Sequence, residues 1–220
     1  MSRPPIEIET APNPTATVIV MHGLGADGND FVPIAQELDL SAVGPVRFVF
    51  PNAPVIPVTI NRGVPMPAWY DILLPDLARQ EDEAGLRRSL ALIEGLIANE
   101  KARGIPAHRI VVAGFSQGCA MSLLTGLRHP ETLAGIVGLS GYLPLAATTA
   151  AERHAANHET PVFLAHGAYD NVVVPARALA ARELLTGLGY AVEWHEYPIA
   201  HSVCLEEIAD LNAFLLRVLK

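Results

Sequence analysis

The apolar positions of this chain fall into two alternating patterns. Short, largely apolar runs are bounded by glycine, proline or polar residues, which is typical of buried β-strands. Between them lie longer segments in which apolar residues recur every three or four positions, as on one face of an α-helix. The predicted buried strands cover residues 15–21, 46–50, 110–113, 133–139 and 161–167.

Two weaker strands and several helices complete the pattern. Residues 6–10 predict an edge strand, and residues 191–197 alternate between apolar and polar side chains, as expected of a half-exposed strand near an edge. Because strands alternate with helices, we predict an α/β fold with a mostly parallel, twisted central sheet and helices on both faces. The predicted helices cover residues 30–38, 80–102, 119–127, 176–188 and 206–219.

The segment from residue 51 to residue 77 follows neither pattern. It is rich in proline and in apolar residues, without a clear period. A long irregular apolar segment in a globular domain usually packs over another part of the structure. This segment would either seal an edge of the sheet or wall a substrate pocket, and its apolar surface would also favour a homodimer.

The composition is that of one domain with a large core. The chain has 220 residues, 50% of them hydrophobic, and no stretch resembles a linker. We therefore predict a single domain over residues 1–220. The net charge is −8 and there is no basic cluster, so nucleic acid and anionic membrane surfaces are disfavoured as partners. A small-molecule or acyl substrate fits better.

Neither a targeting segment nor a disulfide framework is evident. The N-terminal residues lack the apolar core of a secretory signal, and two cysteines, Cys119 and Cys204, are too few for a framework. Residues 132–151 carry no charge, but three glycines and a proline interrupt them, which favours a central strand and a loop over a membrane span. We predict a cytoplasmic protein without stable membrane insertion.

The strongest catalytic signal is the sequence Gly-Phe-Ser-Gln-Gly at residues 114–118. The pattern G-x-S-x-G between a buried strand and a helix is the nucleophile elbow, in which a serine stands on a sharp turn. Gly114 and Gly118 lack the Cβ atoms that would collide in such a turn. Ser116 is therefore the candidate nucleophile. The alternative is a glycine-flanked serine in an ordinary strand-to-helix turn.

A second glycine-rich loop follows the predicted strand at residues 15–21. From Gly23 to Gly28 it has the spacing G-x-G-x-x-G, the dinucleotide-binding fingerprint, which leaves a dinucleotide-dependent oxidoreductase as an alternative function. Two features oppose that function. The strand at residues 46–50 is followed by Pro-Asn where an acidic residue should grip a ribose, and Asp27 would repel a pyrophosphate.

The competing interpretation of this loop is an oxyanion hole. Glycine-rich backbone after the first core strand can direct an N–H group at a carbonyl oxygen held above the serine. We predict the backbone N–H of Leu24 as one donor and that of Gln117, at the start of the following helix, as the other.

Polar candidates collect where the predicted strands end. Ser116, Asp170 and His201 follow three of these strands, in the order nucleophile, acid, base of an α/β-hydrolase. His201 would take the proton of Ser116 as the serine attacks an acyl carbon, and Asp170 would orient the imidazole. His195 is the main rival base, but it lies in mid-strand. If these residues are not reactive, the alternative is a non-catalytic binding protein on the same fold.

Two other histidines, His154 and His158, lie one helical turn apart, a spacing that could bind zinc. No glutamate follows His154 as it would in a zinc protease, and no third ligand is evident. We therefore predict no metal site.

Six segments together carry a resemblance to a known family. They are His-Gly-Leu-Gly-Ala-Asp-Gly-Asn at 22–29, Pro-Asn-Ala-Pro at 51–54, Met-Pro-Ala-Trp-Tyr-Asp-Ile at 66–72, Gly-Phe-Ser-Gln-Gly at 114–118, Ser-Gly-Tyr-Leu-Pro at 140–144 and His-Gly-x-x-Asp-x-Val-Val-x-Pro at 166–175. This set, spread over nearly the whole chain, resembles the phospholipase/carboxylesterase family, which includes acyl-protein thioesterases and bacterial carboxylesterases.

The resemblance implies an α/β-hydrolase that needs no cofactor and hydrolyses carboxylic esters or thioesters through an acyl-enzyme intermediate. Acyl-protein thioesters, lysophospholipids and small esters are the substrates it suggests. Ser116, Asp170 and His201 fall on the family's triad, and Leu24 and Gln117 on its oxyanion donors. The segment 51–77 would help to form the acyl pocket, and the predicted contacts are Met66, Trp69, Leu73 and Leu74.

Two positions depart from the family's pattern. Cys119 stands where a further glycine is usual, which would loosen the packing of the helix behind the nucleophile. Ile199 and Ala200 replace the more usual Met-Gly before His201, which would stiffen that loop. Neither change removes a catalytic atom.

Overall fold

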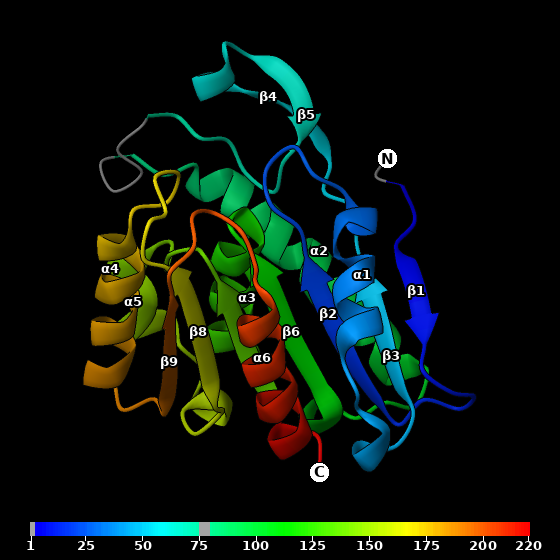
Figure 1. Cartoon of the computed structure of the whole chain (residues 1–220). Coiled ribbons are helices and arrows are strands. Elements are labelled where there is room, and N and C mark those ends of the chain that lie inside the picture. The colour runs from blue at the N-terminus through cyan, green and yellow to red at the C-terminus, as the bar shows by residue number, and fades with distance from the viewer. Residues whose placement is uncertain (1–2, 75–79) are drawn as a thin grey trace.

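A seven-stranded sheet forms the centre of the computed structural model, which describes residues 3–74 and 80–220 (Figure 1). The strand order is β1-β3-β2-β6-β7-β8-β9, and every pairing is parallel except that of β1 with β3. The strands are β1 (Ile6–Glu9), β2 (Ala16–Met21), β3 (Val46–Phe50), β6 (Ile110–Phe115), β7 (Gly135–Leu139), β8 (Val162–Gly167) and β9 (Val192–Tyr197). All strands predicted from the apolar pattern are therefore present, and the two weaker ones lie at the edges.

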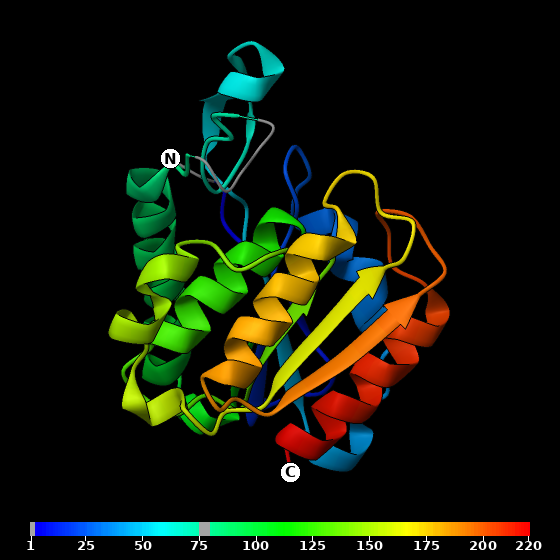
Figure 2. The same cartoon turned by 90° about the vertical axis from the view of Figure 1, so that its left-hand side faces the viewer.

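Helices cover both faces of the sheet, as predicted (Figure 2). On one face lie α1 (Val32–Glu37) and α6 (Leu205–Val218), and on the other α2 (Glu83–Ala102), α3 (Gln117–Arg128) and α5 (Pro175–Gly187). Each face has its own buried apolar cluster, and the strands alternate side chains between the two. The mostly parallel sheet with helices on both faces is the architecture predicted from the alternation of strands and helices.

Capping side chains account for two of the helix starts that differ from the sequence prediction. The helix expected at residues 30–38 begins as a 3₁₀ turn at Gly28–Phe31, where Asp27 accepts from the backbone of Asn29, and continues as α1. The helix expected at residues 80–102 starts at Glu83, because the Asp82 carboxylate accepts from Gly85 N. Capping carboxylates bind the unpaired N–H groups of a first turn and so decide where the helix begins.

The segment predicted to be irregular contains a β-hairpin. Its strands, β4 (Val55–Val58) and β5 (Val64–Pro67), pair antiparallel and project above the carboxyl ends of the central strands (Figure 1). Several prolines and a largely exposed surface hide the period of these short strands in the sequence. The last residues of the predicted segment, 75–77, lie outside the described residues.

The uncharged stretch at residues 132–151 supplies β7, a loop and the short helix α4 (Ala146–Glu152). Its glycines are needed in the strand and the following loop, since a Cβ on Gly138 would lie 2.7 Å from Cys119 Sγ. Within the described part of the chain, no helix is long and apolar enough to cross a membrane.

Candidate active site

Ser116 stands on a sharp turn between β6 and α3. Its backbone angles are φ 58° and ψ −116°, a conformation that side-chain-bearing residues rarely adopt. The turn closes so tightly that a Cβ on Gly114 would lie 2.1 Å from Gly118 O, and one on Gly118 would lie 2.0 Å from Met21 O. Only glycine fits either position. The two glycines of the sequence motif thus permit the turn that raises the serine above the sheet.

His201 links Ser116 to Asp170. Ser116 Oγ lies 3.0 Å from His201 Nε2, and His201 Nδ1 lies 2.6 Å from Asp170 Oδ2. Both separations are hydrogen-bonding distances, with Nδ1–H donating to the carboxylate and the serine hydroxyl donating to Nε2. The structure therefore brings together the three residues that chain order alone suggested. The Asp170 side chain is fully buried, whereas that of His201 is 16% exposed and open to a substrate.

The loops that carry Asp170 and His201 are joined by backbone hydrogen bonds. Ala168 N–H donates to Tyr197 O at 2.8 Å, and Tyr169 N–H donates to Ile199 O at 3.0 Å. The loops approach closely because residue 167 is glycine, whose Cβ would otherwise lie 2.4 Å from Ala200 O. This pairing fixes the acid and the base relative to each other through the main chain.

The segments that carry the two predicted oxyanion donors adjoin the serine. Gln117 is the first residue of α3, where backbone N–H groups have no partner within the helix. Gly23, the neighbour of Leu24, packs against the serine so closely that an added Cβ would lie 3.2 Å from Ser116 Cβ. The loop of Leu24 and the start of α3 therefore both adjoin Ser116.

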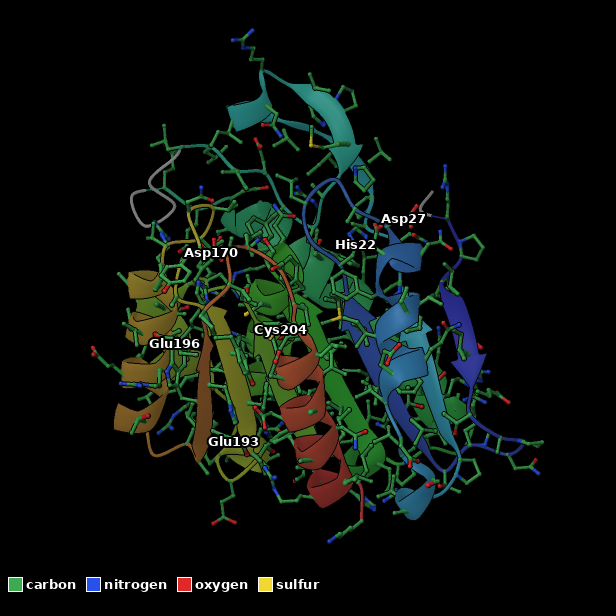
Figure 3. The ribbon with its side chains drawn as sticks, in the orientation of Figure 1. His22, Asp27, Asp170, Glu193, Glu196 and Cys204 are labelled. Atoms are coloured by element: carbon green, nitrogen blue, oxygen red, sulfur yellow. The ribbon has the colours of Figure 1, made fainter. Side chains whose placement is uncertain are left out.

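His22 holds the glycine-rich loop in place. Its Nδ1–H donates to Gly23 O at 2.7 Å, and Ala53 N–H donates to its Nε2 at 3.0 Å. These partners assign the proton of the neutral ring to Nδ1. Burial lowers the pKa of His22, in keeping with this neutral form. His22 lies at the same end of the sheet as Asp170 (Figure 3).

The side chain of Gln117 has a role that sequence reasoning did not identify. Its Oε1 accepts from Trp69 N–H at 3.0 Å, and its Nε2–H donates to Tyr70 O at 3.0 Å. The residue that supplies a predicted oxyanion N–H thereby fastens the chain after the hairpin to the start of α3. No spacing in the sequence signals this contact, because the two segments are far apart along the chain.

The residues predicted to contact an acyl chain differ in their surroundings. Met66 is half-buried next to Gly25, whose N–H donates to Pro67 O at 2.8 Å, so β5 lies against the glycine-rich loop. Leu73 is half-buried and Leu74 is 40% exposed. Trp69 is only 2% exposed, and its Nε1–H donates to His22 O at 2.8 Å. Trp69 thus supports the loop and offers little surface to a ligand.

The glycine-rich loop is poorly suited to hold a dinucleotide. Several of its N–H groups already have acceptors: Gly28 N donates to Asn52 Oδ1 at 3.0 Å, and Asn29 N donates to Asp27 Oδ1 at 2.8 Å. A pyrophosphate would need these donors for itself. The structure therefore argues against the oxidoreductase alternative.

Neither of the other histidine sets competes with the triad. His195 lies between two carboxylates, 2.9 Å from Glu193 Oε1 and 3.2 Å from Asp210 Oδ2. Glu193 is distant from Asp170, toward the other end of the sheet (Figure 3). In the described part of the chain, no group of three potential metal ligands includes His154 or His158.

The two departures noted in the sequence are accommodated by close packing. Cys119 is 2% exposed, and its thiol occupies the space that Gly138 and Gly141 leave free, since a Cβ on Gly141 would lie 2.5 Å from Sγ. The expectation of looser packing behind the nucleophile is therefore wrong. Ile199 O and Ala200 O take part in backbone hydrogen bonds of the His201 loop, and these do not depend on the side chains.

Comparison with known proteins points to one family. The profile of the phospholipase/carboxylesterase family matches residues 5–219. Acyl-protein thioesterase 1 of Neurospora crassa is 44% identical over 97% of this chain and 91% of its own length, and that of Mycosarcoma maydis is 45% identical over 94% and 92%. The crystal structure of Arabidopsis thaliana SOBER1 is similar with a TM-score of 0.88 at 29% identity, covering 93% of this chain and 99% of SOBER1. Zea mays acyl-protein thioesterase 2 has a TM-score of 0.83 at 27% identity, covering 98% and 99%.

Proposed function

The chain belongs to the phospholipase/carboxylesterase family and is a serine hydrolase of esters or thioesters, and from this premise we propose that Ser116, His201 and Asp170 carry out the hydrolysis. The observation that carries the proposal is the continuous chain of contacts from Ser116 Oγ through His201 to Asp170, at 3.0 Å and 2.6 Å.

In the first half of the reaction, Ser116 Oγ attacks the acyl carbon and its proton passes to His201 Nε2. The negative oxygen of the tetrahedral intermediate accepts from the N–H groups of Leu24 and Gln117. When the intermediate collapses, the bond to the leaving oxygen or sulfur breaks and His201 gives that atom its proton. The acyl group remains on Ser116.

In the second half, water attacks the acyl-enzyme while His201 takes a proton from it, and the carboxylic acid leaves as Ser116 regains its proton. Asp170 stays ionised throughout and stabilises the imidazolium that forms in each half. The buried carboxylate, which accepts from Val172 N and Val173 N, suits this constant charge.

We propose thioesters of acylated proteins as the natural substrates. Relatives that are named acyl-protein thioesterase 1 and are 37–45% identical to this chain support this choice. Small esters and lysophospholipids would react by the same steps. The acyl chain would lie near Met66, Leu73 and Leu74, beside the hairpin and the glycine-rich loop.

The first test is the Ser116→Ala variant. Its kcat/KM on a p-nitrophenyl ester should fall by several orders of magnitude, about 10³-fold or more, because the nucleophile is gone. The wild type, but not the variant, should take up one equivalent of a fluorophosphonate label. Undiminished turnover by the variant, or an unlabelled wild type, would contradict the proposal.

The second test addresses the substrate. A series of p-nitrophenyl esters of increasing acyl length, read as kcat/KM, should pass through a maximum at the length that the site near Met66 and Leu74 accommodates. An acylated peptide thioester should exceed the best of these esters in kcat/KM. If lysophospholipid is turned over faster than the peptide, the protein-thioesterase assignment fails while the hydrolase mechanism stands.

A cytoplasmic location and a homodimer are further proposals. The two cysteines are both unpaired, which suits a reducing compartment. Exposed apolar side chains on the hairpin, Val55 at 66% and Val64 at 53%, support association. Sedimentation of the full chain at several concentrations measures the oligomeric state.

A further inference from the structure

His166, near the end of β8, lies against the carboxylate that orients His201. We propose that His166 is a positioning residue that fixes Asp170 and moderates its charge, a role that rests on the hydrolase function proposed above. Its Nε2 is 2.8 Å from Val173 O and 3.4 Å from Asp170 Oδ2. Both side chains are fully buried, at 0% exposure, so water does not screen this contact.

The ring orientation follows from these neighbours. Both atoms near Nε2 are acceptors, so Nε2 carries a proton and donates to Val173 O. The other ring nitrogen, Nδ1, is buried and has no hydrogen-bond partner among the described residues. The polar function of His166 is thus exerted through Nε2 alone.

The bond to Val173 O closes the turn that contains the acid. Val172 N–H and Val173 N–H donate to Asp170 Oδ1 at 2.8 Å and 2.9 Å. His166 holds the carbonyl of the same Val173 from the other side. Both the N–H and the C=O of Val173 are therefore hydrogen-bonded, which holds the turn in place. Asp170 Oδ2 remains available to His201.

The same Nε2–H also affects the charge of Asp170. Oδ2 is the oxygen that accepts from His201 Nδ1 at 2.6 Å, and His166 Nε2 lies 3.4 Å from the same oxygen. A nearby N–H dipole draws negative charge toward itself and so weakens the pull of the carboxylate on the proton of an imidazolium. Without His166, Asp170 would stabilise a charged His201 more strongly.

The experiment compares three replacements of His166 in the full chain. The glutamine side chain of His166→Gln is long enough to place its amide nitrogen where Nε2 lies. The side chain of His166→Asn is too short to do so, and that of His166→Leu has no donor. His195→Gln is the matched control, because His195 is paired with Glu193 and Asp210 away from the site. For each variant, kcat and KM for a p-nitrophenyl ester are measured across the pH range of activity, with the melting temperature as a check of folding.

We expect His166→Asn and His166→Leu to lower kcat by about 10- to 100-fold, because a displaced acid misplaces the base. KM should stay within about two-fold, since His166 does not touch the substrate. In these two variants the acid limb of the kcat/KM profile should move to higher pH. His166→Gln should restore most of the rate and the original profile, and His195→Gln should match the wild type.

A role in packing alone predicts a different result. The inference is overturned if all three variants share one pH profile, or if Gln is no better than Asn at equal melting temperature. Should the Leu variant fail to fold, the comparison of Gln with Asn decides. Fluorophosphonate labelling of the wild type distinguishes failure of the hydrolase proposal from failure of the role proposed for His166. An unlabelled wild type contradicts the hydrolase proposal itself. A labelled wild type with unaffected His166 variants contradicts only the role of His166.

Discussion

Ser116 adopts φ 58° and ψ −116°, and a residue held in such a sparsely populated conformation costs on the order of 1–3 kcal/mol. The surrounding structure maintains it: Ser116 N–H donates to Leu139 O at 2.9 Å, and Ala120 N–H donates to Ser116 O at 3.2 Å. The strain holds the hydroxyl at the carboxyl end of the sheet, within reach of His201. At the residue scale, the site therefore depends on the space that two glycines leave free.

A Gly118→Ala substitution tests this dependence. The new Cβ would lie 2.0 Å from Met21 O, so β2 and α3 must separate. We expect a loss of stability of about 1–3 kcal/mol or more, and a fall in kcat/KM because the elbow moves. Urea unfolding and ester turnover measure the two effects.

Gly95→Ala is the control for this substitution. Gly95 lies within α2, and a Cβ there meets nothing within 4 Å. Alanine should stabilise this helix by about 0.5–1 kcal/mol and leave activity unchanged. Equal behaviour of the two alanine variants would show that the elbow is not sterically constrained.

At the scale of elements, α3 and the chain after β5 form one unit. The Gln117 carboxamide binds the main chain of Trp69 and Tyr70, and Gly25 N–H binds Pro67 O at 2.8 Å. The hairpin, the glycine-rich loop and the start of α3 are thus tied together around Ser116. A change in the position of one is transmitted to the others through these few hydrogen bonds.

Gln117→Met would remove the side-chain bonds while keeping the backbone N–H. One N–H and one C=O would then be buried without partners, at a cost of about 1–3 kcal/mol each. We expect a lower melting temperature and a rise in KM that is larger for long acyl esters than for short ones. Gln36→Met, on the exposed side of α1, is the control. Equal losses for long and short esters would mean that Gln117 does not connect the hairpin region to the site.

At the scale of the whole molecule, the parallel topology brings the site together. The loops after β2, β6, β8 and β9 all leave the same end of the sheet (Figure 1), because the strands run parallel. These loops carry Leu24, Ser116, Asp170 and His201. Ser116 and His201, 85 positions apart in the chain, thereby become neighbours.

The stability of the whole fold should depend on the ionisation of Glu207. This residue of α6 is 1% exposed, and burial raises its pKa from 4.5 to about 8, against a smaller opposing effect of the Cys204 backbone. The unfolded chain releases this proton near pH 4.5 and the folded chain only near pH 8. The contribution of protonated Glu207 to the free energy of unfolding is therefore complete below pH 4.5 and is lost as the pH rises through about 8.

Glu207→Gln removes this dependence. The melting temperatures of variant and wild type should coincide near pH 4.5, and by pH 8 the variant should be higher by about 4 °C or more. Glu206→Gln, an exposed neighbour on the same turn, should show no such divergence. A constant difference between Glu207→Gln and wild type at all pH values would contradict the raised pKa.

Local patterns were sufficient for the strands of the central sheet, for most of the helices and for picking out the three residues that hydrogen-bonding contacts join in the structure, Ser116, His201 and Asp170. Ile110 to Ala113 reads as a buried strand, and Gly114 and Gly118 mark the elbow, because periodicity and turn chemistry act over a few residues. Local patterns were not sufficient for the hairpin, because its prolines and exposed positions obscure the alternation expected of a strand. The tight packing of Cys119 was also missed, because it depends on glycines of another strand and loop.

By itself, the sequence determined the order of the central strands and the helices beside them, and it placed Ser116, Asp170 and His201 after three of those strands. Only the tertiary structure decided that Gln117 binds the chain beyond the hairpin, that the Trp69 indole donates to His22 O, and that His166 Nε2 lies near Asp170 Oδ2. The physical reason is that hydrogen bonds and packing between distant segments leave no period in the chain. They exist only once the sheet has brought its carboxyl ends together.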